Sequence, residues 1–386
     1  MNVKKLYYED PHIREFTACV TGCEPSEKGW RVTLSATAFY PEGGGQACDL
    51  GTLGSTRVLY VREEGEQVVH LCDSPLEVGS QVAGRIDWQR RFDLMQQHTG
   101  EHILSGLIYE KYGYHNIGFH VGKNAMEVDF DGPIPAEVLQ ELEKAANQAV
   151  WENIPLKCWY PAPEELPHVF YRTKRALPWP VRIVQIPGYD SCACCGVHVK
   201  RTGEVGLIKI LSCTKFHEGI RLEMLCGQRA YDYLCRIHEE NRQVSQIFSA
   251  KPLQTGAAAQ KAAEDLAREK LTSNTLRGRI FAGIAENCRG RENVLHYEQD
   301  LTPGQVRQLA DAVAAVCSGM AAVFSGSEQS GYTLCIVSQN RDVRALGAQA
   351  CQALQGRGGG KPGAFQGSFR ASKEEIEGFF REHFVI

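Results

Sequence analysis

Four side chains in two short motifs, about ninety residues apart, constrain the fold of this 386-residue chain more than any other feature. The motifs are His98-x-x-x-His102 and Cys194-x-x-x-His198. Three imidazoles and one thiolate make a complete ligand set for one tetrahedral Zn²⁺ per chain. Either motif alone is more often a surface or core feature, but their joint occurrence favours a zinc site. A fold that forms this site must bring the two segments together.

The surroundings of the two motifs predict different local structures. Apolar residues recur at roughly helical spacing over residues 92–108, so His98 and His102 should project from one face of a helix, a turn apart. The second motif lies in a glycine-containing stretch that leads into residues 203–211, which has the pattern of a loop feeding a strand. A helix and the edge of a sheet would then hold the ion between them.

Composition and charge exclude several classes of protein. The formal net charge is −4, from 42 basic and 46 acidic residues, so any contact with nucleic acid must use a local basic surface. The chain has no run of eighteen apolar residues, and its first residues lack the apolar stretch of a signal peptide. We therefore expect a cytoplasmic protein that does not enter a membrane and keeps its 15 cysteines reduced.

Patterns along the chain predict an α+β multidomain protein. Residues 1–90 alternate in short runs separated by turns, which is typical of a β-barrel. Residues 91–229 mix helical and strand patterns and would form the α+β domain that contains the zinc site. Residues 230–278 show heptad-like spacing and then an Ala-rich stretch, which indicates a helical hairpin or coiled coil. Residues 279–386 alternate strand and helix patterns and predict a small α/β domain.

Two glycine clusters invite a search for phosphate-binding loops. Gly43, Gly44 and Gly45 allow positive φ angles or a close backbone approach, although a plain turn between strands is an equal alternative. No helical pattern follows them, so neither a dinucleotide-binding fingerprint nor a P-loop is predicted. The second cluster, residues 356–363, also fails as a P-loop because Pro362 occupies the position of the required Ser or Thr. We expect a basic glycine loop there that contacts phosphates or packs a domain edge.

Three motifs in order carry a resemblance to a known family. The stretch from Thr37 to Gln46, the first ligand motif, and the second ligand motif with the residues 199–206 that follow it resemble the editing domain of alanyl-tRNA synthetases. No aminoacylation domain is present, so the chain is more similar to free-standing alanyl-tRNA editing proteins of the AlaX type. The similarity covers about residues 1–230. The helical region and the glycines at 358–360 further resemble the domain that follows editing in the synthetases, which points to the long AlaX form.

The resemblance implies a hydrolase that removes serine, or glycine, from mischarged alanine tRNA. In the family's pattern Thr37 lies in the pocket that senses the amino acid, while Gln46 and the backbone of Gly43, Gly44 and Gly45 bind near the ester. A pocket built to hydrogen-bond the serine hydroxyl would leave polar groups unpaired when alanine enters. Basic residues follow the second ligand motif, and of these Lys200 and Arg201 are expected to contact the substrate. The C-terminal region is expected to mediate a homodimer or to add affinity for tRNA.

Several alternatives remain open at the level of sequence. Glu101 could be a catalytic base, a partner that orients a ligand imidazole, or a solvent-facing helix residue. With both histidines it also fits the inverted metallopeptidase motif His-x-x-Glu-His, while four protein ligands also suit a purely structural zinc site in a tRNA-binding module. Zinc with four protein ligands can activate water only through a fifth position or a loosened ligand, so positioning of the substrate is the other possible role.

Three neighbouring cysteines are candidates for the single thiolate ligand. Cys192 and Cys195 flank Cys194, but a spacing of four residues to the histidine favours Cys194 as the ligand.

Single-stranded RNA ends are often bound by stacking on aromatic side chains. The candidates considered from sequence are Tyr114, Phe119 and Phe216.

Overall fold

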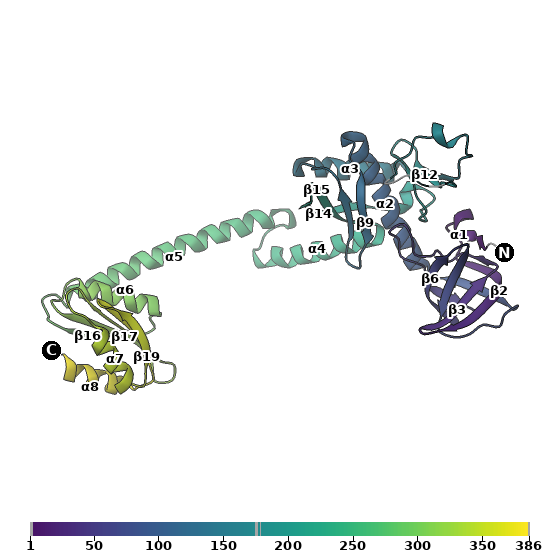
Figure 1. The fold of residues 1–386 in the computed structure, drawn as a ribbon. Coiled ribbons are helices and arrows are strands. Elements are labelled where there is room, and N and C mark those ends of the chain that lie inside the picture. The colour runs from purple at the N-terminus through teal and green to yellow at the C-terminus, as the bar shows by residue number, and fades with distance from the viewer. Residues whose placement is uncertain (1–2, 174–176, 178, 385–386) are drawn as a thin grey trace. The chain divides into compact units, whose positions relative to one another are not determined.

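The computed structural model describes residues 3–173, 177 and 179–384 of the chain. Within these residues the chain forms eight α-helices and twenty β-strands. It divides into two compact units, Met1–Gln243 and Val244–Ile386, whose elements are labelled in Figure 1. Each unit contains its own clusters of buried apolar side chains. The α+β multidomain architecture predicted from the sequence is confirmed.

Six strands near the N-terminus form a closed barrel in the order β2-β3-β7-β6-β5-β8. Their bounds are Glu15–Ser26 (β2), Gly29–Leu34 (β3), Gly51–Leu53 (β5), Thr56–Glu64 (β6), Gln67–Cys72 (β7) and Gln81–Ile86 (β8). Strand β8 shows why the register is fixed, because exposed and buried residues alternate along its whole length. A slip of one residue would turn Arg85 into the apolar interior.

A loop at one end of the barrel carries the first glycine cluster. It follows a short parallel pair of strands and a one-turn helix: β1 (Lys4–Lys5), β4 (Ala36–Thr37) and α1 (Leu6–Glu9). Gly44 and Gly45 adopt φ angles of +59° and +81°, in the region that favours glycine. A Cβ atom on Gly45 would lie 2.4 Å from the ring of Phe119, which belongs to a strand beyond the barrel. The glycines therefore permit both the turn and a close approach between the two parts of this unit.

The central element of the first unit is helix α2 (Trp88–Tyr112), which contains the first ligand motif. It begins at Asp87, whose side chain caps the backbone N–H of Arg90, and it ends at Gly113 with a left-handed φ of 71°. The helix is buried on nearly all sides from Leu94 to Ser105. This burial explains why its sequence shows only an approximate apolar stripe.

A buried ion pair attaches α2 to the barrel. The guanidinium of Arg91 donates through Nε to both carboxylate oxygens of Asp49 at 2.9 Å, and both side chains are completely buried. Arg91 also donates to the backbone carbonyls of Pro11 and Ala38, while Asp49 accepts the backbone N–H of Tyr40. Each charge is thus paired and hydrogen-bonded, as burial requires.

Two sheets and one further helix surround α2. The larger sheet has the order β14-β15-β10-β9, and the smaller has the order β11-β12-β13. Strands of the larger sheet are β9 (Asn116–Val121), β10 (Met126–Phe130), β14 (Ile208–Phe216) and β15 (Gly219–Cys226). Strands of the smaller sheet are β11 (Lys157–Trp159), β12 (Ile183–Ile186) and β13 (Asp190–Ala193). Helix α3 (Ala136–Glu152) and the 3-10 turns η1 (Leu166–His168) and η2 (Thr202–Val205) complete this part.

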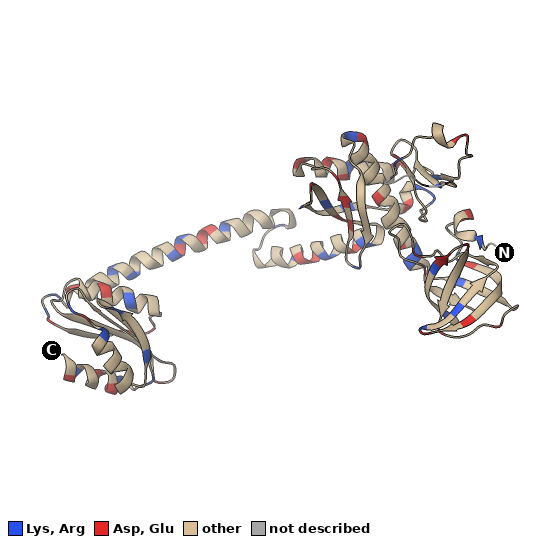
Figure 2. Cartoon of the chain, viewed as in Figure 1, with Lys and Arg blue, Asp and Glu red and all other residues tan. Residues whose placement is uncertain are grey.

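Two long helices occupy the region for which the sequence predicts a hairpin or coiled coil. They are α4 (Gly227–Ile247) and α5 (Thr255–Glu286), and the 3-10 turn η3 (Pro252–Gln254) lies between them in the chain. Both helices carry Lys and Arg as well as Asp and Glu residues along their length (Figure 2). No helix in the described part of the chain combines the length and apolar character needed to cross a membrane.

The second unit contains a five-stranded sheet with helices on both faces. The strand order is β16-β17-β18-β20-β19. In β17, Ala321 and Val323 pack with residues of α5 and α6, while Ala322 and Phe324 pack with residues of α7 and α8. The strands are β16 (Val294–Tyr297), β17 (Met320–Ser327), β18 (Gly331–Ser338), β19 (Arg357–Lys361) and β20 (Ala364–Phe369). The helices are α6 (Pro303–Ala314), α7 (Arg344–Ala353) and α8 (Lys373–His383).

The prediction of a glycine loop within residues 356–363 is wrong. Residues Arg357–Lys361 form β19, an edge strand that pairs with β20. A Cβ atom on Gly360 would lie 2.1 Å from the carbonyl oxygen of Ala364, so only glycine fits against the neighbouring backbone there. Glycine has a low preference for strands, which is why the sequence predicts a loop.

Candidate metal centre

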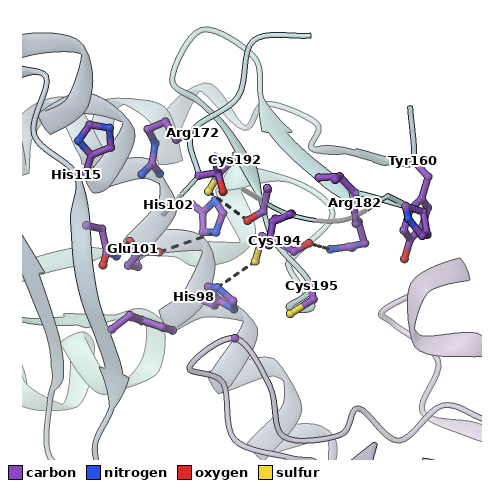
Figure 3. Close-up of a pocket in the computed structure, with 18 residues that line it drawn as sticks. His98, Glu101, His102, His115, Tyr160, Arg172, Arg182, Cys192, Cys194 and Cys195 are labelled. Atoms are coloured by element: carbon purple, nitrogen blue, oxygen red, sulfur yellow. Dashed lines mark hydrogen bonds and ion pairs between the residues drawn. The ribbon is translucent and has the colours of Figure 1, made fainter. Parts of the chain in front are cut away.

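The four side chains of the two ligand motifs meet beside α2. Figure 3 shows three of them, His98, His102 and Cys194. One candidate ligand atom from each lies within 4.8 Å of the others. The sulfur of Cys194 is 3.5 Å from Nε2 of His98 and 3.5 Å from Nε2 of His198. Zinc bonds of about 2.1 Å to nitrogen and 2.3 Å to sulfur, at a tetrahedral angle, separate the two atoms by about 3.6 Å. The spacing of these side chains therefore fits a metal ion at their centre.

Each ligand imidazole is oriented by a partner at its other ring nitrogen. Nδ1 lies at hydrogen-bond distance from a side-chain oxygen in all three cases: Gln46 Oε1 for His98 (2.8 Å), Asp190 Oδ2 for His102 (3.0 Å) and Thr99 Oγ1 for His198 (3.1 Å). The amide oxygen and the carboxylate can only accept, so Nδ1 of His98 and of His102 is the donor, and Nε2 of each ring is left to face the other ligands. This arrangement is the usual support for histidines that bind a metal.

Asp190 is itself held by Arg172, which contacts both carboxylate oxygens, including the Oδ2 atom that accepts from His102. Nε and Nη2 of Arg172 donate to the two carboxylate oxygens at 2.7 and 3.0 Å. Burial alone would raise the pKa of Asp190, but hydrogen bonds from His102 and Arg172 lower it below its usual value. Asp190 therefore stays ionised and fixes the ring of His102. Sequence reasoning missed both residues, although an acidic residue four positions before Cys194 is a weak signal.

The charge balance of the cluster favours a cation. Although burial opposes ionisation of the thiol, the nearby imidazoles of His98 and His102 hold the pKa of Cys194 well below its usual value. Burial would lower the pKa of His102, but Cys194 and Asp190 raise it well above its usual value. Burial, with His98 nearby, lowers the pKa of His198 to about 3. The low pKa of Cys194 favours a thiolate, and the low pKa of His198 favours a neutral imidazole. Both are the forms that bind a metal ion, and the thiolate is stabilised by a positive charge beside it.

The loop of the second motif is fixed by contacts from two directions. Arg182 donates through Nη1 to the carbonyl of Cys194 at 2.9 Å and to that of Gly196 at 2.8 Å. Its guanidinium also lies 4.6 Å over the ring of Tyr8, whose hydroxyl donates to the carbonyl of Cys195. These contacts place Cys194, rather than Cys195, against the histidines.

A cavity of about 500 Å³ opens beside the cluster. Its walls include His98, His102 and Cys194, together with Glu101, Phe119 and Gly44 of the glycine loop. Cys192 and Cys195 also line it, and Cys192 forms a second possible ligand group with His102 and Asp190. The cavity is large enough for an amino acid and a sugar, and it has both apolar and charged walls.

Glu101 does not face solvent. Its side chain is 4% exposed and accepts hydrogen bonds at Oε1 from Ser105 Oγ and Asn116 Nδ2. The other oxygen, Oε2, lies 3.9 Å from Nε2 of His102. The carboxylate therefore sits on the cavity wall with one oxygen directed toward the metal cluster (Figure 3).

Four other residues predicted from the sequence to belong to the site, Thr37, Gln46, Lys200 and Arg201, do not line this cavity. Thr37 is buried in the barrel, where its hydroxyl lies 2.8 Å from Nε2 of His70. Lys200 pairs with Asp10 at 2.9 Å, and Arg201 donates to the backbone carbonyl at position 153. Among the described residues, neither of these cations nor Thr37 lines the cavity. Gln46 takes part through His98, and its Nε2 is buried with no hydrogen-bond partner among the described residues.

Two family models match separate parts of the chain. "Threonyl and Alanyl tRNA synthetase second additional domain" matches residues 181–223, which include the second ligand motif. "DHHA1 domain" matches residues 291–382, which include all five strands of the sheet of the second unit. The two matches agree with the separation of the chain into two units.

Similar proteins align with nearly the whole chain. Alanyl-tRNA editing protein Aarsd1-A of Xenopus laevis is 28% identical over 391 residues, which cover 95% of this chain and 94% of that protein. Alanine–tRNA ligase of Thermofilum pendens is 31% identical over 390 residues, which cover 95% of this chain but 42% of the ligase. Alanyl-tRNA editing protein Aarsd1 of Mus musculus is 30% identical over 390 residues, 94% of this chain and 93% of its own length. From this full-length similarity, the chain belongs to the family of alanyl-tRNA editing proteins.

Proposed function

We propose that this protein is a trans-acting deacylase that hydrolyses the ester between serine, or glycine, and alanine tRNA. Its full-length similarity to proteins named alanyl-tRNA editing proteins carries this proposal. A cavity that borders four converging metal-type ligands supports it, because ester hydrolysis needs a confined polar site. The ester bond of an aminoacyl-tRNA is already reactive, so the site must mainly orient it and a water molecule.

Zinc is the metal that we propose for the site. Three imidazoles and one thiolate suit zinc better than the oxygen-binding ions calcium and magnesium. When bound, it would supply positive charge and Lewis acidity beside the cavity. His98, His102, Cys194 and His198 would hold one ion per chain.

The protein's own residues would perform the proton transfers and the positioning. We assign Glu101 as the base, because its Oε2 remains available on the cavity wall while Oε1 is held by two donors. In this reaction the oxygen of water bonds to the acyl carbon, and one water proton moves to Glu101. The bond from the acyl carbon to the ribose oxygen then breaks, and that oxygen receives the proton. The products are the free amino acid and uncharged tRNA.

The remaining residues of the predicted site would bind the substrate. Gly44 on the cavity wall would bring the backbone of the loop, including Gly43 and Gly45, close to the ester, and Nε2 of Gln46 is a donor without a partner among the described residues. The role of Thr37 in sensing the amino acid stays a prediction, because its hydroxyl is paired with His70. Contact of Lys200 and Arg201 with the phosphates of tRNA also stays a prediction.

Deacylation of charged tRNA tests the function. We expect the purified protein to release serine from alanine tRNA and to spare the same tRNA charged with alanine. Glu101→Gln should slow release by about 100-fold or more, since it removes the base but leaves the metal ligands in place. The rate is measured from loss of labelled amino acid, with the zinc content of both proteins checked. No release by wild-type protein that contains one zinc would instead favour a tRNA-binding module with a structural metal site.

The support of His102 by Asp190 gives a prediction about metal affinity. Asp190→Asn should weaken zinc binding by about 10- to 100-fold, because the charge that stabilises the imidazole is lost. Asp129→Asn is a matched control: both aspartates are 8% exposed, and Asp129 accepts from Arg221 at 2.7 and 2.9 Å, away from the ligands. Affinity is measured by competition with a chromogenic chelator. An equal loss in both variants would mean that Asp190 acts only through stability.

We also propose a cytoplasmic location and a homodimer formed through the C-terminal region. The absence of a membrane-spanning helix in the described residues is compatible with the first proposal. Exposed leucines on α5, among them Leu266, Leu271 and Leu276, support the second, because exposed apolar side chains along one helix favour association. Sedimentation equilibrium of the full chain distinguishes a dimer from a monomer.

A further inference from the structure

A second cavity, of about 420 Å³, adjoins the one at the metal cluster. Arg172 lines both cavities, and it lies across His102 from Tyr160 and Arg182 in Figure 3. The second cavity is formed by the part of α2 that follows the ligand motif and by the turn between β12 and β13. No step in the proposed hydrolysis uses it.

A row of aromatic rings leads from the first cavity to the second. His115 lines the first cavity, and its ring centroid is 5.1 Å from that of Tyr109. Tyr109 and Phe170 both line the second cavity, with ring centroids 6.1 Å apart. Phe170 is 69% exposed, so its ring is available to a partner. A single exposed aromatic is unremarkable, but a connected row beside a site for RNA is a platform for stacked bases.

The polar groups of the second cavity favour bases over phosphates. The carboxylate of Glu110 and the amide of Gln185 are on its wall. Arg172 is the one arginine among the described residues of its wall, and its guanidinium is engaged by Asp190. A carboxylate repels a phosphate but accepts a hydrogen bond from the amino group of adenine or cytosine.

We propose that this row binds the single-stranded 3′ end of the RNA substrate. The terminal aminoacyl-ribose would occupy the first cavity, and a preceding base would stack on Phe170 in the second. The inference rests on the proposed function, which supplies an RNA with a reactive 3′ end. It adds a direction for the strand, along α2 past Tyr109, and a residue that holds it. Phe170 is then a positioning residue, since it does not touch the ester.

Tyr160 lines the first cavity and lies across it from His115 in Figure 3, and Trp179 contacts the residue that follows Tyr160 in the chain. Tyr160 and Trp179 are 50% and 59% exposed. Tyr160 packs edge-on to Tyr8, and Nε1 of Trp179 donates to the carbonyl of Pro161. Neither lines the second cavity. The RNA could instead pass over Tyr160 and Trp179, so the experiment tests variants of both residues.

Binding of uncharged RNA separates this inference from catalysis. The probe is a fluorescent RNA stem with a single-stranded 3′ extension that ends in CCA, and its control is the same stem with a blunt end. Anisotropy titrations should show that Phe170→Ala weakens binding of the extended stem by about tenfold. Binding of the blunt stem should not change. Phe170→Trp should restore affinity, because it keeps a stacking surface.

A matched control uses an aromatic residue outside the row. Trp151 is 68% exposed on α3 and lines neither cavity, so Trp151→Ala should leave the affinity unchanged. Equal affinity of wild type and Phe170→Ala for the extended stem would overturn the inference. So would a loss confined to Tyr160→Ala or Trp179→Ala, or wild-type binding that ignores the extension. If the wild type binds the extension through Phe170 but releases no serine, the proposed activity fails while the binding surface remains.

Discussion

Cys194→Ser should leave the protein without bound metal and without deacylase activity. The sulfur lies 3.5 Å from two ligand nitrogens, and its pKa is held low enough for a thiolate despite burial. A serine hydroxyl stays protonated and is a poor ligand for zinc. Loss of a residue that only orients a ligand lowers metal affinity by up to about 100-fold. Because Cys194 is itself a ligand, its loss should lower zinc affinity by more than that. Metal content after gel filtration and chelator competition give the two readouts.

The adjacent cysteine provides the control for this experiment. Cys195→Ser makes the same chemical change one residue away, at an exposed side chain that has no contact with the histidines among the described interactions. It should keep one equivalent of zinc. Metal-free wild type is the reference for folding, since loss of metal alone changes stability. Retention of zinc by Cys194→Ser, or its loss from Cys195→Ser, would contradict the assignment of the thiolate.

Arg91→Ala should lower the free energy of unfolding of the first unit by about 3–5 kcal/mol, because it leaves the buried carboxylate of Asp49 without its partner. The pair is fully buried, and Arg91 also satisfies two backbone carbonyls. The result is measured by urea unfolding of the full chain, with the transitions of the two units followed separately.

An exposed pair of the same type gives the comparison. Arg57 and Asp73 lie 2.7 Å apart on the barrel, and the Arg57 side chain is 72% exposed. Arg57→Ala should lower the free energy of unfolding far less than Arg91→Ala does, since solvent screens the charges. Similar losses for Arg57→Ala and Arg91→Ala would show that burial does not set the strength of the inner pair.

The local elements of the metal centre could be predicted from the sequence, but their supports could not. The spacing of His98 and His102 on a helix is a local property, and α2 is the helix expected there. Asp190 and Arg172 act through contacts between strands and loops far apart in the chain, so no local period reveals them. The glycines of β19 have a local preference for a loop, and the sequence therefore predicts one there. They form a strand instead, because only glycine fits against the close neighbouring backbone.

The aromatic residues also show which features the sequence predicts and which depend on tertiary contacts. From sequence, Tyr114, Phe119 and Phe216 were equal candidates for base stacking. In the structure Tyr114 stacks on Tyr112, Phe119 stacks on His98, and Phe216 lies under the guanidinium of Arg221. Which rings keep a free face depends on tertiary packing. Composition alone cannot decide it.

The barrel fixes the position of the ligand helix along its own axis. Among the contacts of its β4–β5 loop with α2 are those of Asp49 with Arg91 and of Gln46 with His98. These two helical positions are seven residues apart, about two turns, so they face the same direction. Insertion of one residue between them would rotate His98 by about 100° relative to Arg91 and break one attachment. The length of this seven-residue segment is therefore as restricted as the spacing within the ligand motifs, although none of its inner residues need touch the metal.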